Sequence, residues 1–467
     1  CTDHVDYEAI EGYQITSEIY FQQEADYDAA LVGTYDVLQW LFFNIQLGAI
    51  ASEITLCGGE SATDYIGIQQ IDDMTHYPEN NVLRQIWQFL YEGVNRANYM
   101  EENKANIDFE GKEAMYGEVY FLRAYYYFEL VKFFGDVPLF TEARLTAGQA
   151  GTLTRTPKDE VYAQIELDLQ NAIASLPNSQ SQVGRVNKYT AYALLGKVLL
   201  YQDKFAEAAS ALDNVIGVYS LVSDYGSQFL RFGENGPESV FEIQYSNQSN
   251  WYDWGCAHCS EGNYAIIMNG PRGWSGPEYA QGWSFNVPTE EFYNSFEEGD
   301  SRRDATVLDI EAFAAATGAS YTEGYDHTGY FNNKYIPRAG ESGGQTELNY
   351  LTNFRIIRYS DVLLMAAEAY NRGGIDDGLA QEFLNQVRRR AFGGDDNDIS
   401  ASGSALTDAI WEERKFELSL EGHRFFDLVR TGRASSLIAG FVEGKHEVFP
   451  IPQQEVDISG LTQNAGY

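Results

Sequence analysis

Apolar residues recur at spacings of three and four through residues 109–142, which is the period of an α-helix. The repeating positions are Tyr116, Tyr120, Phe121, Ala124, Tyr127, Phe128 and Val131. Further aromatic residues widen this surface beyond a single stripe, so we expect a helix over 112–134 that is buried on several sides. Arg123 and Glu129 fall inside the apolar run and should be paired with opposite charges. Gly135 marks the end of the helix.

Helical periodicity also recurs on both sides of this segment. It predicts three further helices, over residues 24–40, 81–103 and 156–175. The stretch 53–77, between the first two of them, is irregular and contains glycine. We therefore expect loops there, and these loops carry Tyr65 and Tyr77.

Two segments, 187–218 and 355–390, have the spacing of tetratricopeptide helix pairs. In the first, small residues such as Gly196 stand where the two helices would cross. The second is expected to begin with a buried helix over 354–369. Each pair buries its apolar face only by stacking on a neighbouring pair, so several pairs are needed, and the helices before residue 176 would supply the others.

Residues 223–350 break the helical pattern. Four of the seven Trp lie there, and short strand-like pieces such as 240–245 alternate with turn residues. So long a loop-rich insertion in a helical domain is usually functional. The chain is therefore predicted to be mostly α-helical, with tetratricopeptide-like pairs in 24–218 and 354–392 and a ligand-binding insertion that contains short strands. After an N-terminal tether over 1–20, residues 21–467 form a single domain.

The charge balance excludes one class of partner and disfavours another. The chain has 31 basic and 69 acidic residues, a net charge of -38. Nucleic-acid binding is therefore not expected, because it needs a basic surface, and direct adsorption to anionic lipid is disfavoured. The sequence has no zincin, Walker A or dinucleotide-binding motif, so we expect no cofactor.

The four cysteines suggest two features. Cys1 opens the sequence, which is typical of a bacterial lipoprotein cut just before a lipid-carrying Cys; the alternative is a chance start of the sequence. Cys256 and Cys259 form a C-x-x-C pair without the second pair of a zinc site. Outside the cytoplasm a disulfide is favoured over free thiols, and a metal site is the least favoured state.

Several acidic patterns raise the question of catalysis or metal binding. Glu413, Glu417 and Glu421 lie one helical turn apart and could serve as acid and base in glycoside cleavage, but nearby basic residues favour ion pairs instead. Residues 340–344 match the G-x-S-x-G elbow without its flanking strand and helix. Residues 395–398 could hold calcium, although a solvated acidic loop is the simpler interpretation. We therefore expect no enzymatic activity and no metal site.

Several motifs stand in a fixed order along the chain. They are residues 121–128, 134–139, 285–304, 354–369, 411–418, 421–430, 449–452 and 461–464. Together they resemble the SusD/RagB family of nutrient-binding outer-membrane lipoproteins, and the start at Cys1 is similar to the lipidated start of that family. Arg302 and Arg303, in the aromatic-then-Asp-x-Arg segment of this pattern, have nearby acids and are expected to form structural ion pairs.

The resemblance implies a function and a partner. It implies a cell-surface lipoprotein, anchored in the outer membrane, that binds oligosaccharides and delivers them to a SusC-like TonB-dependent transporter as its lid. A RagB-like branch of the family handles peptides, which leaves oligopeptides as a second class of ligand. Two further functions stay open from the sequence: a secreted glycosidase, and a plain helical scaffold that binds another protein.

Aromatic residues in turn-rich segments are the candidates for contact with such a ligand. Indole and phenol rings pack on the C–H faces of sugar rings, while nearby polar groups bond the hydroxyls. The candidate residues are Trp251, Tyr252, Trp254, Trp274, Trp283, Tyr65 and Tyr77.

Overall fold

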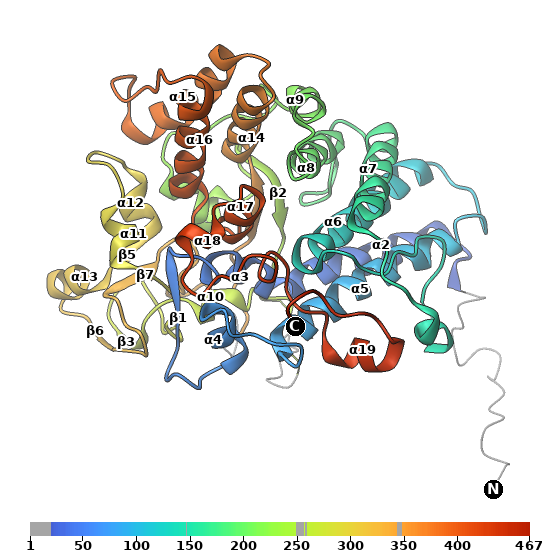
Figure 1. The fold of residues 1–467 in the computed structure, drawn as a ribbon, viewed down its shortest axis with the longest axis horizontal. Coiled ribbons are helices and arrows are strands. Elements are labelled where there is room, and N and C mark those ends of the chain that lie inside the picture. Colours follow the sequence, from blue (N-terminus) through green and yellow to red (C-terminus); the bar gives the residue numbers. More distant parts are fainter. Residues whose placement is uncertain (1–19, 146, 249–255, 257–258, 343–347) are drawn as a thin grey trace, which may run out of the picture.

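The computed structural model describes residues 20–145, 147–248, 256, 259–342 and 348–467. The protein is mostly helical, with 50% helix and 9% strand, which confirms the predicted fold class. Figure 1 shows α2 and α5–α7 in one half of the molecule, the insertion on the opposite side, and α14–α16 at the top left.

Two groups of helices flank the insertion in the sequence, one before it and one after it. The first group is α2 (Glu24–Asp36), α3 (Phe42–Ile50), α4 (Ile66–Asp72), α5 (Asn81–Glu102), α6 (Lys112–Phe134), α7 (Lys158–Ser175), α8 (Lys188–Leu200) and α9 (Phe205–Asp213). The second is α14 (Tyr359–Arg372), α15 (Asp377–Phe392), α16 (Gly403–Leu418), α17 (Arg424–Arg430), α18 (Ala434–Leu437) and α19 (Gln453–Ser459). The insertion carries α10 (Ala265–Met268), α11 (Glu290–Asn294), α12 (Arg302–Thr306) and α13 (Ile310–Thr317).

Helix α6 has the predicted bounds and packs between α5 and α7. Almost every side chain from Tyr116 onward is buried in the main hydrophobic core. The guanidinium of Arg123 donates two hydrogen bonds to the carboxylate of Asp168, at 2.7 and 2.8 Å. Glu129 accepts hydrogen bonds from Lys132 and from the amide of Asn44. The predicted pairing of both buried charges is therefore confirmed.

The two predicted helix pairs are α8 with α9 and α14 with α15, and α14 packs against α9, so the pairs stack. Gly196 lets α8 approach α9, because a Cβ there would lie 2.5 Å from the side chain of Leu212. The second pair starts later than predicted. Residues Phe354–Arg358 are a strand, β8, and the helix begins only at Tyr359.

The strands form four two-stranded antiparallel sheets. The pairs are β1 (Thr55–Gly58) with β4 (Phe285–Pro288), β2 (Ser239–Ile243) with β8, β3 (Arg272–Ser275) with β6 (Ser320–Thr322), and β5 (Val307–Asp309) with β7 (Tyr330–Asn332). Residues 53–77 are more regular than expected, since they contain β1 and α4. The β1–β4 and β2–β8 sheets each pair a strand of the insertion with a strand that lies outside it.

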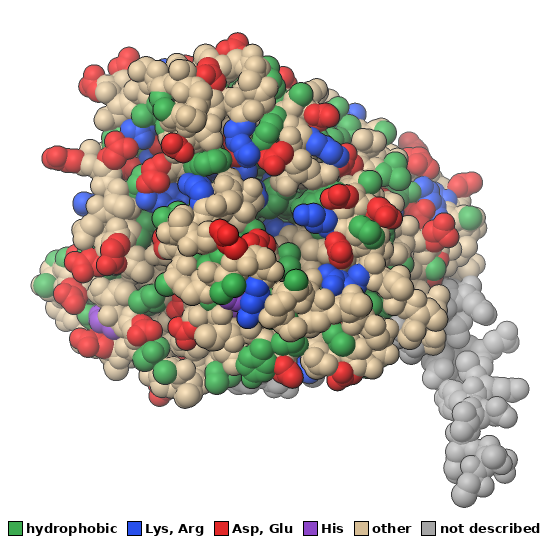
Figure 2. All heavy atoms as spheres, viewed as in Figure 1, with side chains coloured by type: hydrophobic (Ala, Val, Ile, Leu, Met, Phe, Trp, Pro, Cys, Tyr) green, Lys and Arg blue, Asp and Glu red, His purple; other side chains and the backbone are tan. Residues whose placement is uncertain are grey.

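The described surface is acidic, as the net charge of the sequence predicts. On the face in Figure 2, acidic side chains are spread over the whole described surface, with fewer basic ones between them. In the part of the chain that the structure describes, no helix is both long enough and apolar enough to cross a membrane.

Candidate functional site

Three aromatic side chains from separate segments meet at the start of helix α3. The ring of Tyr65 lies 5.4 Å from that of Phe43, and the ring of Tyr264 lies 4.7 Å from that of Phe42. Trp283 meets Tyr264 edge to face at 5.6 Å. All three are packed against the core but keep part of their surface exposed. We call Tyr65, Tyr264 and Trp283 the aromatic cluster.

The β1–β4 sheet brings these segments together. The N–H of Gly59, just after β1, donates to the carbonyl oxygen of Ser284 at 2.8 Å. Gly58 has φ +71°, and a Cβ there would lie 2.1 Å from the same oxygen, so glycine is needed for this approach. The N–H of Trp283 donates to the carbonyl oxygen of Ile267 in α10, at 2.9 Å, which fixes the indole beside Tyr264.

Tyr65 is held in a backbone conformation that a large side chain rarely adopts. Its φ of 50° and ψ of 56° lie in the left-handed region, immediately before α4. Such a residue costs on the order of 1 kcal/mol, and it persists where the surroundings fix it. Here the fixed points are its ring contacts with Phe43 and Phe285, the latter at 6.3 Å. Strain of this kind is typical of ligand-binding positions.

Charged groups lie beside the aromatic cluster. Arg272 donates to the carboxylate of Asp64 at 2.8 Å, and the backbone N–H of Glu60 donates to the same carboxylate at 2.8 Å. The side chains of Arg272 and Asp64 remain 22% and 30% exposed. Burial, together with the negative charge of Asp64, raises the pKa of Tyr264 to about 12, so its hydroxyl stays protonated. This arrangement presents both donors and acceptors at the edge of an aromatic surface.

The other described candidates lie apart from this cluster. Trp274 packs in a second hydrophobic group, with ring distances of 6.0 Å to both Tyr279 and Phe313. Tyr77 is 47% exposed on the loop between α4 and α5, and this loop contacts α19 through Pro78. The structure therefore brings together Tyr65 and Trp283 but not Trp274 or Tyr77.

Some predicted residues lie outside the described part of the chain. These are Trp251, Tyr252, Trp254 and Cys1, with the N-terminal tether and residues 343 and 344 of the segment 340–344. Cys256 and Cys259 are joined by a disulfide, close to Tyr264 in the sequence.

Sequence reasoning missed Tyr264, Asp64 and Arg272. Tyr264 is one of 33 Tyr and precedes an apolar run, so only its place in the insertion could have singled it out. Asp64 and Arg272 are far apart in the sequence, and only the folded structure makes them neighbours.

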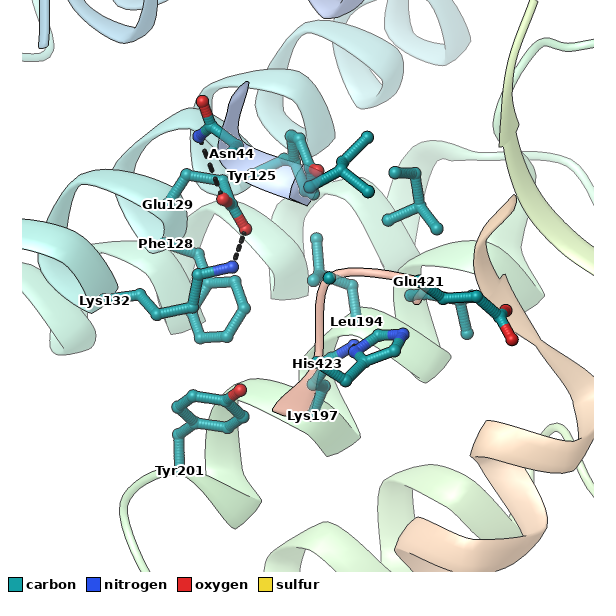
Figure 3. A pocket seen from close by; sticks show the side chains of 14 residues that line it. Asn44, Tyr125, Phe128, Glu129, Lys132, Leu194, Lys197, Tyr201, Glu421 and His423 are labelled. Carbon is teal, nitrogen blue, oxygen red and sulfur yellow. Dashed lines mark hydrogen bonds and ion pairs between the residues drawn. The ribbon is translucent and has the colours of Figure 1, made fainter. Parts of the chain in front are cut away.

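A buried polar cavity, shown in Figure 3, is a poor candidate for ligand binding. It has a volume of about 30 Å³, which leaves room for water but not for a sugar ring. Its charges are already paired: Lys132 with Glu129, and Lys197 with Asp361. Lys197 also lies 3.2 Å from His423, and burial, together with that positive charge, holds the pKa of His423 well below its usual range. The imidazole is therefore neutral and internal.

The chain matches two family models. One, described as the SusD family, covers residues 237–440, and the other, described as "Starch-binding associating with outer membrane", covers residues 52–200. A solved laminarin binding SusD-like protein is 36% identical, with a TM-score of 0.87 over 96% of this chain and 100% of that chain. The chain belongs to the SusD family.

Other SusD-family relatives match over nearly the whole chain. Surface glycan-binding protein A from Bacteroides thetaiotaomicron, solved in complex with laminarihexaose, is 29% identical, with a TM-score of 0.85 over 94% of this chain and 99% of that chain. A SusD-like protein of Formosa agariphila is 29% identical over 97% of this chain and 94% of its own length.

The carboxylates of the SusD-family motif near the C-terminus are buried in ion pairs. Arg302 lies 2.6 Å from Glu413 and 3.1 Å from Glu417, and Arg358 lies 2.8 Å from Glu417 and 2.7 Å from Glu421. All five side chains are at most 1% exposed. These carboxylates therefore form ion pairs as expected, but with arginines from distant segments rather than with the basic residues near them in the sequence.

The acidic loop 395–398 likewise has a structural contact. Asp398 pairs with Arg389 at 2.5 Å. Among the described residues, no group of three or more His, Cys, Asp or Glu side chains is placed to hold a metal ion.

Proposed function

We propose that the protein is a glycan-binding protein that holds laminarin-type oligosaccharides, which are β-1,3-linked glucose chains, on the aromatic cluster. The observation that carries this proposal is the convergence of Tyr65, Tyr264 and Trp283 beside Asp64 and Arg272. Partly exposed rings offer apolar faces for glucose rings, and the ion pair offers groups that bond hydroxyls. The laminarin and laminarihexaose named for two similar solved proteins support this choice of glycan.

We also propose that the protein works at the cell surface, anchored in the outer membrane through lipid on Cys1, as the lid of a SusC-like TonB-dependent transporter. The family description, which names association with the outer membrane, supports this location. Membership of the SusD family supports the choice of partner, and the protein would bind its ligand and deliver it intact. Co-purification of a SusC-like barrel with the lipidated chain, and loss of lipid labelling in Cys1→Ser, are the expected results.

Calorimetric titration with laminarihexaose tests the binding site. Trp283→Ala should weaken binding by about tenfold or more, equal to about 1.4 kcal/mol, because the ligand loses one ring of the cluster. Trp274→Ala and Tyr77→Ala are matched controls, since both remove a partly exposed ring outside the cluster, and they should leave the affinity unchanged. Equal losses in Trp283→Ala and Trp274→Ala would contradict this assignment.

The same titration separates the remaining ligand classes. Binding of mixed peptides without binding of any glycan would transfer the protein to the RagB-like branch. Shorter sugars formed during incubation with laminarin would identify a glycosidase and refute a pure binding role.

A further inference from the structure

A second hollow lies in the helical half of the molecule, where α5 and the C-terminal helix α19 lie side by side in Figure 1, and Pro138, Phe140, Leu145 and Leu153 complete its lining. Its volume is about 190 Å³. Aromatic residues form much of its wall, and two acidic residues also line it, Glu92 from α5 and Glu455 from α19. The hollow is separate from the aromatic cluster of the proposed glycan site and shares no residue with it.

The aromatic wall is fixed in place by neighbouring contacts. The ring of Tyr91 stacks on that of Phe140 at 5.7 Å with 13° between the planes, and its hydroxyl donates to the carbonyl oxygen of Pro138 at 2.8 Å. The carbonyl oxygen of Phe140 accepts hydrogen bonds from Asn98 and Tyr127, at 2.9 and 2.7 Å. The hollow therefore does not need to form when a ligand arrives, which lowers the entropic penalty of binding.

The charge of this hollow is unbalanced. In the described part of the chain, no hydrogen bond or ion pair reaches the carboxylate of Glu455, and partial burial raises its pKa despite the positive charge of Arg84. Arg84 itself donates to Gln454. Glu92 stands at the rim, 45% exposed and paired with Arg96. None of the described lining residues is basic.

We propose that this pocket binds an organic cation on an apolar stem, with Glu455 as the counter-charge. A carboxylate that is partly removed from water and has no partner is stabilised by an incoming cation, and aromatic rings attract cations as well as apolar stems. A neutral sugar could bond Glu455 but would leave its charge uncompensated. The same chemistry is offered by a free alkylamine and by a lysine side chain in a polypeptide.

An NMR titration of the full chain with Nα-acetyl-lysine methylamide tests this proposal, and saturable binding is the expected result. Nα-acetyl-norleucine methylamide has nearly the same stem without the charge and should not bind over the same concentration range. Glu455→Gln should weaken binding of the lysine derivative by about tenfold or more, because a hydrogen bond between two charged groups becomes one to a neutral amide. Asp457→Asn is the matched control, since it removes an exposed charge from the same helix, and it should leave binding unchanged.

The remaining outcomes either refute the proposal or identify the source of the cation. Equal binding of the norleucine derivative, or unchanged binding by Glu455→Gln, would refute it. Glu455→Gln should keep or raise the Tm, because an unpaired carboxylate is replaced by a neutral group, so a loss of binding cannot be confused with unfolding. A lysine-containing tripeptide that binds more tightly than butylamine would indicate a polypeptide ligand, and equal affinities would indicate a free amine. Laminarihexaose binding should be unchanged in Glu455→Gln, which keeps this test separate from that of the glycan site.

Discussion

The buried charges around Arg302 and Arg358 and the aromatic cluster of Tyr65, Tyr264 and Trp283 belong to one chain but are built in opposite ways. In the first region each guanidinium is buried with several carboxylates, and the side chains have no access to water. In the second region the rings and the neighbouring ion pair stay partly exposed. The first region therefore joins α12, β8 and α16, whereas the second can meet a ligand.

Two other buried acids, one among the C-terminal helices and one near the aromatic cluster, differ in a similar way. Glu368, beside Arg430 at 2.7 Å, is fully buried, and that guanidinium lowers the pKa of the carboxyl to about 2 despite the burial. Asp72, which supports the β1–α4 segment below Tyr65, has no such cationic partner among the described residues. Burial, with smaller contributions from nearby acids, raises the pKa of Asp72 to about 7. Conspicuous charged motifs thus form the framework, and the less regular loops carry the candidate site.

The largest expected effect comes from removing a charge of the framework. Arg302→Met should lower the free energy of unfolding by about 3–5 kcal/mol, because the buried carboxylates of Asp300, Glu413 and Glu417 would each lose a cationic partner. Thermal and urea denaturation measure this change. The neighbouring residue gives a matched control: the side chain of Arg303 is 44% exposed and pairs with exposed Asp304, so Arg303→Met should change stability by at most about 1 kcal/mol. Similar losses in both variants would show that the buried network does not hold the fold together.

Helix α6 could be predicted because its signal is local, whereas the buried charges were expected to pair but their distant partners could not be named. The apolar period of α6 continues to Phe134, and Gly135 follows it. Both predicted ends of the helix agree with the structure. The segment Phe354–Arg358 was wrongly expected to be helical, since a short apolar run fits a helix or a strand equally well by period alone. Its partner, β2, lies far away in the sequence.

The candidate site was only partly predictable because its parts are not local. Tyr65 and Trp283 were chosen for lying in turn-rich segments, but so were Trp274 and Tyr77, which pack elsewhere. The pairing of β1 with β4 brings the segments of Tyr65 and Trp283 together, and neither strand has a sequence pattern that identifies its partner. Tyr264 was missed because it is one of 33 Tyr and precedes an apolar run.

The next effect in size concerns pH. The pKa of Asp72 is raised by folding, so its contribution to stability is fully present below about pH 4 and is lost as the pH rises to about 7. Asp72→Asn should therefore raise the free energy of unfolding by roughly 1–2 kcal/mol at pH 8, with little gain at pH 4. Glu368 has the opposite sign, since its lowered pKa makes stability fall as the pH drops from about 4 towards 2. Thermal denaturation of the unmodified protein and of Asp72→Asn from pH 3 to 8 measures the gain in stability. An equal gain at pH 4 and pH 8 would contradict this account of Asp72.

The smallest effect on stability is expected at Asp64, where binding should nevertheless weaken. Asp64→Asn removes half of a surface ion pair with Arg272, so the free energy of unfolding should change by at most about 1 kcal/mol. Affinity for laminarihexaose should nevertheless fall by about fivefold to tenfold, because a charged acceptor for sugar hydroxyls is replaced by a neutral one. Calorimetric titration measures the loss, and Asp304→Asn serves as the control, since it removes an exposed acid that pairs with Arg303, a neighbour of the buried network. If Asp64→Asn bound laminarihexaose as tightly as Asp304→Asn and the unmodified protein, the charged edge of the cluster would have no part in recognition. The aromatic rings alone would then define the site.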